Sequence, residues 1–531
     1  MSRNIVSILI FLLSASAGMS QQGSLKAYTD QVIYIAGEKI WLAGMKLGNT
    51  KDKDHPVRIY LVDRNGNVAD RASIMDAEGR ISCSIQLRAD LPTDFYMLAV
   101  NSVGYLPDLI PIAVINPVNP PKNIGGDAAV YKETEVAKLV PKLERDSYAK
   151  RELVNVAVQP PSDMELQISV VRKDPLSDYV DSVAGSWKKP ELTFVENNSE
   201  GEGQQLKMTV HDATTNELAP GVRVYASVLG DQANIASGLS DGKGSALIAI
   251  PYLYGNASLV LSAIGETGRS YRVVYEEPQV QIKGELGLPL LKLEERFRAS
   301  INERLLNTEV TNKYRPETKL RYVTGNLDTT DFYGKPDKRY MLDDYTRIPN
   351  MEEILYEYVQ EARVRKLGEK PSILVFNTPF KSFFELPAMV LLDGVPVSDI
   401  SQLLALDPLQ LKSIDVVARK FLLDDLQIPG IVHYKSYKAD LGGYKLPAQD
   451  IVYAVQGNAI PIEPLFASFG KDSDQRLPEL RNLLYWTAFH PSEVFKWSFY
   501  TPDNEGEYTL VVRGLDKQGK EYRGEVVVKV K

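Results

Sequence analysis

The sequence predicts a mainly β protein made of tandem β-sandwiches, with one small α/β module at residues 340–445. Short runs of alternating apolar residues recur about every 8–12 residues and end at Gly, Asp or Asn turns, as in sandwiches. The chain has 531 residues, 44% of them hydrophobic, with 36 Gly and 31 Pro. That composition is typical of an ordered chain of several domains.

The N-terminus has the pattern of a secretory signal peptide at residues 1–20. Arg3 precedes an apolar run from Ile5 to Leu13, and small residues follow. The run is too short for a permanent membrane span. We therefore expect cleavage near Gln21 and export to the periplasm, with no transmembrane segment in the mature chain.

Charge narrows the possible partners, and the cysteine content narrows the possible cellular compartments. The formal net charge of −8 disfavours a nucleic-acid partner. The single cysteine, Cys83, excludes an intrachain disulfide and fits a bacterial periplasm better than a disulfide-rich extracellular setting. Because Ile81, Cys83 and Ile85 alternate on one strand face, we expect Cys83 in a core.

Residues 23–117 are expected to form the first sandwich. Its opening residues, Tyr28-Thr-Asp30, Tyr34-Ile-Ala-Gly-Glu38 and Trp41, resemble the start of macroglobulin-type domains in the α2-macroglobulin family. The resemblance implies structural roles for these residues, with Trp41 as a buried anchor of this sandwich. Trapping macroglobulins also carry a Cys-Gly-Glu-Gln thioester, and Cys83 has no such neighbours.

Two further sandwiches are expected, at residues 125–195 and 204–285. In the second, Asp146 to Glu152 repeats the turn pattern found between Thr29 and Glu38. The third is similar to carboxypeptidase-regulatory-like sandwiches, on the evidence of Leu218-Ala-Pro-Gly-Val222 and Ser240-Asp-Gly-Lys-Gly244.

Residues 286–339 are expected to be a connector, with helical spacing over Leu291 to Ile301. In the α/β module that follows, Asn350 can cap a helix that precedes a strand around Arg363-Val-Arg365. A tight turn at Asp393-Gly394 then leads to a short helix from about Ser398, which would bury Leu403 and leave Asp399 and Gln402 outward. The strand Leu411 to Val417 follows.

This order resembles the plug domain of TonB-dependent outer-membrane transporters. The glycines that usually follow the last strand are mostly missing, and no convincing TonB box occurs near the start. Only 86 residues follow the module, too few for a transporter barrel. We therefore expect a docking role, with Asp393, Gly394, Asp399 and Gln402 as candidate partner-binding residues.

The last module, residues 446–531, resembles an immunoglobulin-like sandwich, with Phe495, Trp497 and Phe499 alternating toward one face. The complete order resembles multidomain macroglobulin-plus-plug proteins secreted by Gram-negative bacteria rich in SusC-type transporters. The resemblance implies tandem macroglobulin/immunoglobulin-like sandwiches with one plug-like domain.

The sequence predicts no catalytic, cofactor-binding or metal-binding site. No two of the four histidines, His55, His211, His433 and His490, lie within five residues of each other. The acidic pairs Asp343-Asp344 and Asp424-Asp425 are the kind common on solvated loops, and no loop has the alternating series of a calcium site.

Two functions follow from these observations. The first is a non-enzymatic accessory or scaffold protein of the periplasm that docks onto an outer-membrane complex, either a TonB-dependent or SusC-type transporter or the assembly machinery. The alternative is a hydrolase with its site at a domain junction. A cluster of histidine and carboxylates in a concave pocket would favour the alternative.

Overall fold

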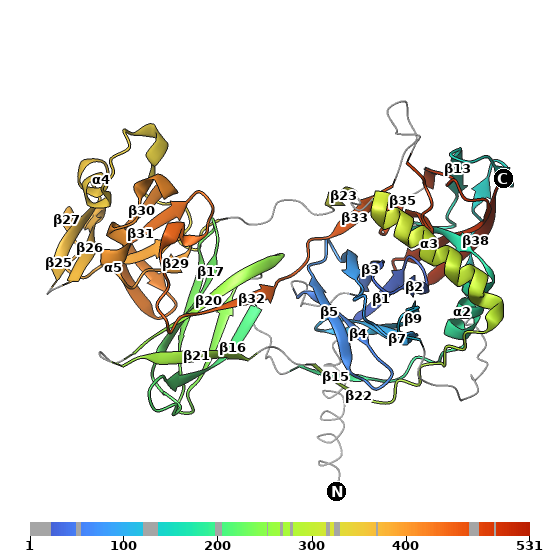
Figure 1. The fold of residues 1–531 in the computed structure, drawn as a ribbon, viewed down its shortest axis with the longest axis horizontal. Coiled ribbons are helices and arrows are strands. Elements are labelled where there is room, and N and C mark those ends of the chain that lie inside the picture. The colour runs from blue at the N-terminus through green and yellow to red at the C-terminus, as the bar shows by residue number, and fades with distance from the viewer. Residues whose placement is uncertain are drawn as a thin grey trace, which may run out of the picture. The chain divides into compact units, whose positions relative to one another are not determined.

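The computed structural model describes residues 23–48, 55–120, 136–196, 204–251, 253–265, 269–276, 280–314, 319–322, 330–367, 370–466, 477–492 and 495–531. The fold is mainly β, as predicted (Figure 1). The predicted signal peptide, residues 1–20, lies outside the described residues. Within them, no helix combines the length and the apolar character that crossing a bilayer requires.

The chain divides into two compact units. Unit 1 comprises Met1–Val195, Gln281–Gly325 and Asn458–Lys531, and unit 2 comprises Glu196–Val280 and Asn326–Gly457. Two short strands, β15 (Thr193–Glu196) and β22 (Val280–Lys283), pair with each other. Unit 2 is thus inserted into the chain of unit 1.

The first sandwich of unit 1 has two sheets, ordered β6-β3-β1-β8 and β2-β9-β7-β4-β5. Its strands are β1 (Gly23–Thr29), β2 (Ile33–Ile35), β3 (Lys39–Leu47), β4 (Val57–Val62), β5 (Val68–Ile74), β6 (Arg80–Gln86), β7 (Asp94–Asn101), β8 (Tyr105–Leu106) and β9 (Asp108–Ile115). Cys83 lies in the core between the sheets, as predicted, and burial raises the pKa of its thiol to about 12.

The second sandwich of unit 1 is discontinuous in sequence, which corrects the predicted boundaries. Its main sheet has the order β10-β38-β37-β14-β34, with β12 on β38 and β35 on β14, and β11-β13-β36 forms the other sheet. The strands are β10 (Ala137–Lys138), β11 (Lys142–Leu143), β12 (Ser147–Tyr148), β13 (Leu153–Val158), β14 (Met164–Lys173), β34 (Leu483–Trp486), β35 (His490–Ser492), β36 (Phe495–Tyr500), β37 (Gly506–Asp516) and β38 (Glu521–Val530). The expected sandwiches at 125–195 and 446–531 are therefore two parts of one sandwich.

The turn pattern that occurs twice in the sequence, at Thr29 to Glu38 and at Asp146 to Glu152, forms the same hydrogen bonds in both sandwiches. In the first, the Gln31 N–H donates to the Tyr34 hydroxyl and the Ile35 N–H donates to Glu38. In the second, Arg145 donates to Tyr148 and Ala149 to Glu152 at the same spacing. Each of these segments contains a short strand, β2 or β12, that pairs in parallel with the last strand of its sandwich, β9 or β38.

The connector contains a helix that the apolar pattern misplaced. α3 (Arg298–Tyr314) follows a short helix η1 (Glu295–Phe297), whereas helical spacing was expected over Leu291 to Ile301. The buried side chains of α3 are polar, namely Ser300, Arg304 and Asn307. Arg304 donates to Asp174, the residue that caps α2 (Pro175–Gly185). β23 (Lys319–Tyr322) then pairs with β33 (Ile462–Leu465).

Unit 2 begins with the third sandwich, whose sheets are β19-β16-β21 and β18-β17-β20-β32. Its strands are β16 (Gln204–Asp212), β17 (Arg223–Leu229), β18 (Asn234–Leu239), β19 (Ser245–Ile250), β20 (Asn256–Ile264), β21 (Tyr271–Glu276) and β32 (Ile451–Gln456). β32 lies beyond the expected boundary at residue 285, in the segment assigned to the last module, and extends this sandwich through β20.

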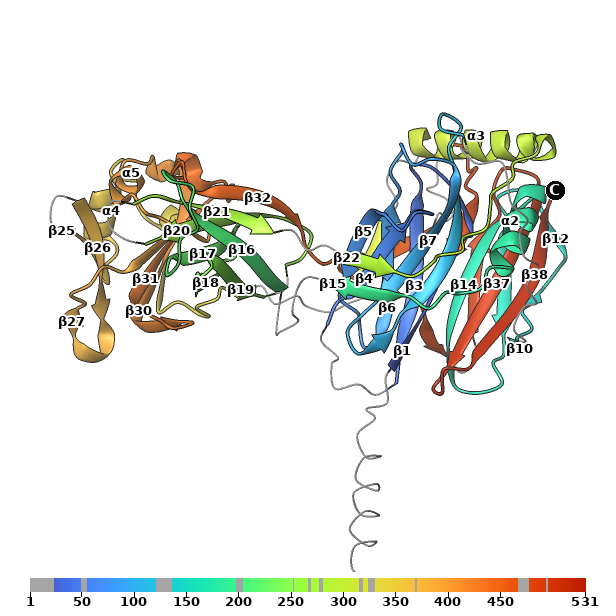
Figure 2. The ribbon, with the colours of Figure 1, turned by 90° about the horizontal axis from the view of Figure 1, so that it is seen from below.

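The α/β module has a mixed sheet, β24-β30-β31-β28-β29, and a smaller sheet, β25-β26-β27. Its elements are β24 (Lys338–Met341), α4 (Met351–Glu357), β25 (Ala362–Leu367), β26 (Lys370–Asn377), η3 (Thr378–Phe380), β27 (Ser382–Phe383), β28 (Met389–Leu392), β29 (Val395–Pro396), α5 (Ile400–Leu404), β30 (Leu411–Leu423) and β31 (Leu426–Ser436), with short helices η2 (Leu342–Asp344), η4 (Pro408–Gln410) and η5 (Leu441–Gly443). Asn350 caps α4 and Leu403 is buried under α5, as predicted. Figure 2 shows β27 at the end of a hairpin that extends from the module.

Candidate functional site

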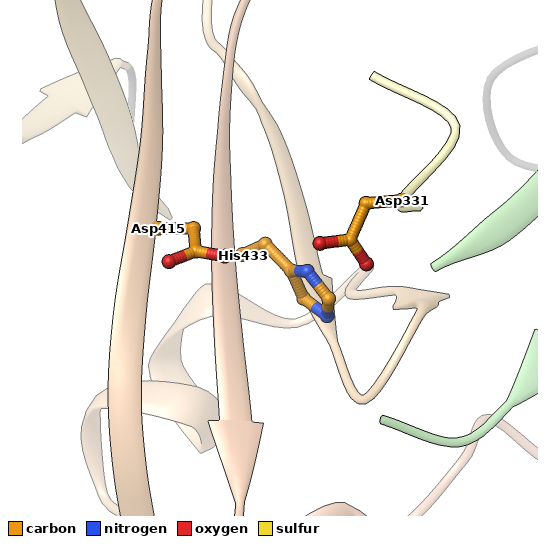
Figure 3. A group of neighbouring side chains, drawn as sticks. All are labelled: Asp331, Asp415 and His433. Atoms are coloured by element: carbon orange, nitrogen blue, oxygen red, sulfur yellow. The ribbon is translucent and has the colours of Figure 1, made fainter. Parts of the chain in front are cut away.

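A cluster of ionisable side chains lies where the α/β module meets the third sandwich inside unit 2. Asp415 of β30 and His433 of β31 are cross-strand partners, and Asp331 comes from the segment before β24 (Figure 3). Alternation directs the neighbouring apolar residues of these strands, such as Ile414 and Val432, into the core of the module. Asp415 and His433 therefore point to the opposite face of the sheet, toward the third sandwich.

Both ring nitrogens of His433 have hydrogen-bond partners. The Gly394 N–H donates to Nε2 over 3.0 Å, so Nε2 carries no proton. Nδ1 lies 2.8 Å from the Tyr333 hydroxyl oxygen and therefore donates to it. Burial lowers the pKa of His433 to about 4, and the charge of Lys435 adds to this effect. The imidazole is thus neutral at physiological pH.

The two carboxylates are balanced by two cations. Arg339 donates to both oxygens of Asp415 over 2.6 Å. Lys435 donates to Asp331 over 2.9 Å, and the Ala233 N–H of the third sandwich donates to the same carboxylate over 2.8 Å. Burial alone would raise the pKa of Asp331, but the Ala233 N–H and Lys435 outweigh it and lower the pKa.

The cluster does not fit a metal ion. Its three possible ligand atoms lie within 4.8 Å of one another. However, the only unprotonated ring nitrogen of His433 accepts a hydrogen bond from the Gly394 N–H, and the Lys435 ammonium already pairs with Asp331. A metal would have to displace both interactions and would face two cations already in place.

The cluster is also closed to a substrate. His433 is 0% exposed, and Asp415 and Tyr333 are buried beside it. A general base must reach the proton it removes, either directly or through one water. The arrangement instead joins the two parts of unit 2, because Asp331 bonds to the third sandwich and Asp415 and His433 belong to the module.

The predicted partner-binding turn is buried, which corrects the expectation of an exposed turn. Asp393 and Gly394 have φ of +48° and +82°, as in the two-residue turn that Asp-Gly favours. The Asp393 carboxylate accepts the N–H groups of Ser436 and Leu441. A Cβ on Gly394 would lie 2.7 Å from the Val228 carbonyl oxygen of the third sandwich. The third sandwich therefore covers this turn.

The other two candidates lie nearer the surface. Asp399 is exposed and caps α5 by accepting the Gln402 N–H over 3.1 Å. The Gln402 side chain is half-buried and donates to the Lys445 carbonyl over 2.9 Å. A role of these two residues in partner binding stays a prediction.

The acidic pairs have structural contacts. Asp424 and Asp425 form the turn between β30 and β31, where Asp424 accepts the Ser237 N–H and Asp425 pairs with Arg223 of the third sandwich. Asp343 accepts from the Tyr437 hydroxyl. These joining roles and the whole His433 cluster were not predicted from the sequence. The available signal was one ionisable residue inside an apolar run of each strand, Asp415 between Ile414 and Val416, and His433 between Val432 and Tyr434.

Comparison with known proteins does not identify a family. No protein-family model matches the chain, and no curated protein matches it. Solved structures of Salmonella α2-macroglobulin align with 96% of this chain at 11% identity, covering 39% of their own chain, with a TM-score of 0.24. Escherichia coli α2-macroglobulin in its native conformation aligns with 97% at 9% identity, covering 40% of its chain, with a TM-score of 0.24. The chain thus spans less than half the length of these proteins, and TM-scores this low establish neither family nor function.

Proposed function

We propose that this protein is a non-enzymatic accessory or scaffold protein of the periplasm, and that its α/β module docks onto an outer-membrane transport or assembly complex. The observation that carries the proposal is the presence of two exposed apolar side chains in the segments on either side of β27. Phe380 is 78% exposed and Leu386 is 68% exposed. Large apolar side chains grouped at a surface are typical of protein contact sites.

The contacts that hold the module to the third sandwich support this role. Its opposite side is held to the third sandwich by the His433 cluster, by the Arg223–Asp425 pair and by a shared apolar core that includes Tyr225 and Ile431. A module fixed in this way presents Phe380 and Leu386 in one orientation, so little conformational entropy is lost when a partner binds.

The proposed location in the periplasm is based on the sequence. The signal-peptide pattern of residues 1–20 favours export, and the resemblance of residues 340–445 to a transporter plug favours an outer-membrane partner. The hydrolase alternative required a histidine and carboxylate cluster in a concave pocket. The cluster at His433 is buried and its hydrogen-bonding atoms are engaged, so it does not favour that alternative.

Site-specific photocross-linking in the native host tests the proposal. A photoreactive residue would replace Ser382, which is exposed beside Phe380, and a control would replace Leu247, which is exposed on the third sandwich. We expect cross-links from position 382 to an outer-membrane transporter or assembly subunit, and their loss in a Phe380→Ser, Leu386→Ser variant. Equal products from both positions, or products confined to soluble proteins, would refute docking through this module.

A further inference from the structure

One edge of the small sheet of the α/β module is open. β25 lies at the end of the order β25-β26-β27, and no other strand in the described part of the chain pairs with its outer side. Ala362 pairs with Val375 and Arg363 with Leu374, in antiparallel register. The Phe376 N–H donates to the Glu361 carbonyl, so residues 361, 363 and 365 direct their backbone groups toward β26.

The alternate residues of β25 direct their backbone groups outward. The Ala362 N–H already donates to the Val359 carbonyl. Val364 and Lys366 remain, and each offers an N–H and a carbonyl with no protein partner among the described residues. Such a row can accept one more strand.

The side chains of β25 define what that strand would carry. Arg363 and Arg365 lie on one face, where the Arg363 guanidinium lies 3.5 Å from the centroid of the Phe383 ring. Ala362 and Val364 lie on the other face and pack against the core of the module. An added strand places its side chains beside these residues on each face. Acidic residues therefore match the arginine face, and small apolar residues match the core face.

A second copy of this chain does not match the edge. In antiparallel pairing centred on Val364, two copies of β25 would bring Arg363 of each copy opposite Arg365 of the other, and like charges directly opposite each other destabilise a sheet. The occupant is therefore a different protein.

We infer that β25 is a strand-addition site for an extended segment of a partner protein in which acidic and apolar residues alternate. This inference rests on the proposed docking function and names its contact surface. The exposed Phe380 and Leu386 lie in the segments that lead into and out of β27, in the same small sheet (Figure 2). β27 is at the opposite edge of this sheet, so β25 and β26 separate these two residues from the added strand, and they would contact another part of the same partner.

Peptide binding to the full-length protein tests the inference. The probe is a fluorescein-labelled peptide, Thr-Glu-Val-Glu-Val-Glu-Val-Thr, and the control peptide has Lys in place of each Glu. Binding is followed by fluorescence anisotropy. We expect the Glu peptide to bind and the Lys peptide to bind at least tenfold more weakly. Equal binding of both peptides would overturn the charge assignment.

Two variants separate backbone pairing from charge. Lys366→Pro removes an outward N–H and places a ring at the edge, whereas Lys366→Ala keeps the N–H. We expect the proline variant to bind the Glu peptide about tenfold more weakly than the alanine variant, because a backbone hydrogen bond is lost and the ring obstructs pairing. Equal affinities would overturn strand addition.

If the proline variant melts at a lower temperature, its weaker binding could reflect lost stability, and Arg365→Glu then provides an independent test of the strand-addition site. Its side chain is exposed and its backbone is unchanged. With Arg363 unchanged on the same face, this variant should lose most of its preference for the Glu peptide, and an unchanged preference would overturn the inference. Cross-linking from Ser382 reports on the docking function separately. Peptide binding without an outer-membrane cross-link would leave the strand site standing and refute the function, and the reverse result would refute the strand site alone.

Discussion

Each unit contains a joint, meaning the contact between its two domains, and the two joints differ in what is buried at their centre. In unit 1 the first and second sandwiches meet through an apolar cluster that includes Trp41, Trp486 and Phe489. The joint of unit 1 also includes the ion pairs Lys26–Glu521 and Arg80–Glu165, whose side chains are partly exposed.

In unit 2 the third sandwich and the α/β module meet around Asp331 and His433 as well as an apolar core. Apolar contacts are non-directional, whereas hydrogen bonds require set distances and angles. The buried polar cluster of the unit 2 joint therefore favours one relative orientation of the third sandwich and the α/β module.

Trp41 shows how alternation produces the apolar joint. Ile40 and Leu42 point into the core of the first sandwich, and Trp41 points out of it, against the second sandwich. Trp41 is buried, as predicted, but it anchors the contact between sandwiches rather than the interior of the first one. The resemblance to macroglobulin-type domains could not show which neighbour would cover it.

Removing Trp41 is expected to have the largest effect on stability. Trp41→Ala should lower the free energy of unfolding of unit 1 by about 3–5 kcal/mol, because it empties the centre of the apolar joint. Hydrogen exchange followed by mass spectrometry should show faster exchange in peptides of unit 1 and no change in unit 2. Trp41→Phe is the control and should lose much less. Unchanged exchange in unit 1 would mean that the joint contributes little.

Breaking the polar joint should cost slightly less. Asp331→Ala leaves the Ala233 N–H without its acceptor and leaves Lys435 with only its longer contact to Asp415, at 3.7 Å, so we expect a loss of about 3 kcal/mol in unit 2. Asp425→Ala removes a more exposed ion pair across the same joint and should cost much less. Urea denaturation with a probe in unit 2 measures both. Similar losses for the two variants would contradict a central role for the buried cluster.

The pH dependence of unit 1 should reflect Asp30 beneath Trp41. The Asp30 carboxylate accepts from the Tyr34 hydroxyl and the Trp41 N–H, and burial raises its pKa to about 7. The folded state then holds a proton that the unfolded state releases near pH 4. Its contribution to stability is therefore full below about pH 4 and is lost as the pH rises through 7.

Asp30→Asn isolates this contribution, because the amide oxygen can accept the same two hydrogen bonds without titrating. The stability of the natural protein, relative to that of the variant, should fall by about 2 kcal/mol between pH 5 and pH 7. Urea denaturation at a series of pH values, with a probe in unit 1, measures the difference. A constant difference across this range would show that Asp30 is ionised in the folded state.

Unit 2 should respond to pH in the opposite direction through His433. Its pKa is lowered to about 4, so the unfolded state binds a proton first as the pH falls. The stability that neutral His433 provides is full above about pH 6.5 and is lost as the pH falls toward 4. Between pH 6.5 and 5.5 the loss should be about 1 kcal/mol. His433→Gln should abolish this part of the dependence in the same hydrogen-exchange assay, and an unaltered slope would place the titration elsewhere.

Local features of the chain could be predicted from its sequence. Strand alternation predicted Cys83 in a core, the capping pattern predicted Asn350 at a helix start, and the Asp393-Gly394 pair predicted a tight turn, because each depends on neighbours within a few residues. The repeat of the Tyr34 and Glu38 turn at Tyr148 and Glu152 was visible for the same reason. α3 was misplaced because its buried face is polar, so it has no apolar stripe to detect.

The association of distant segments could not be predicted from the sequence. The second sandwich takes β14 and β37 from either side of an insertion of several hundred residues, and the pairing depends on cross-strand register. The His433 cluster likewise combines Asp331, Asp415 and His433, whose chemistry is set by burial and by Ala233 of another sandwich. Sequence spacing carries no information on such contacts, because the chain between them can take any path that returns the strands to the sheet.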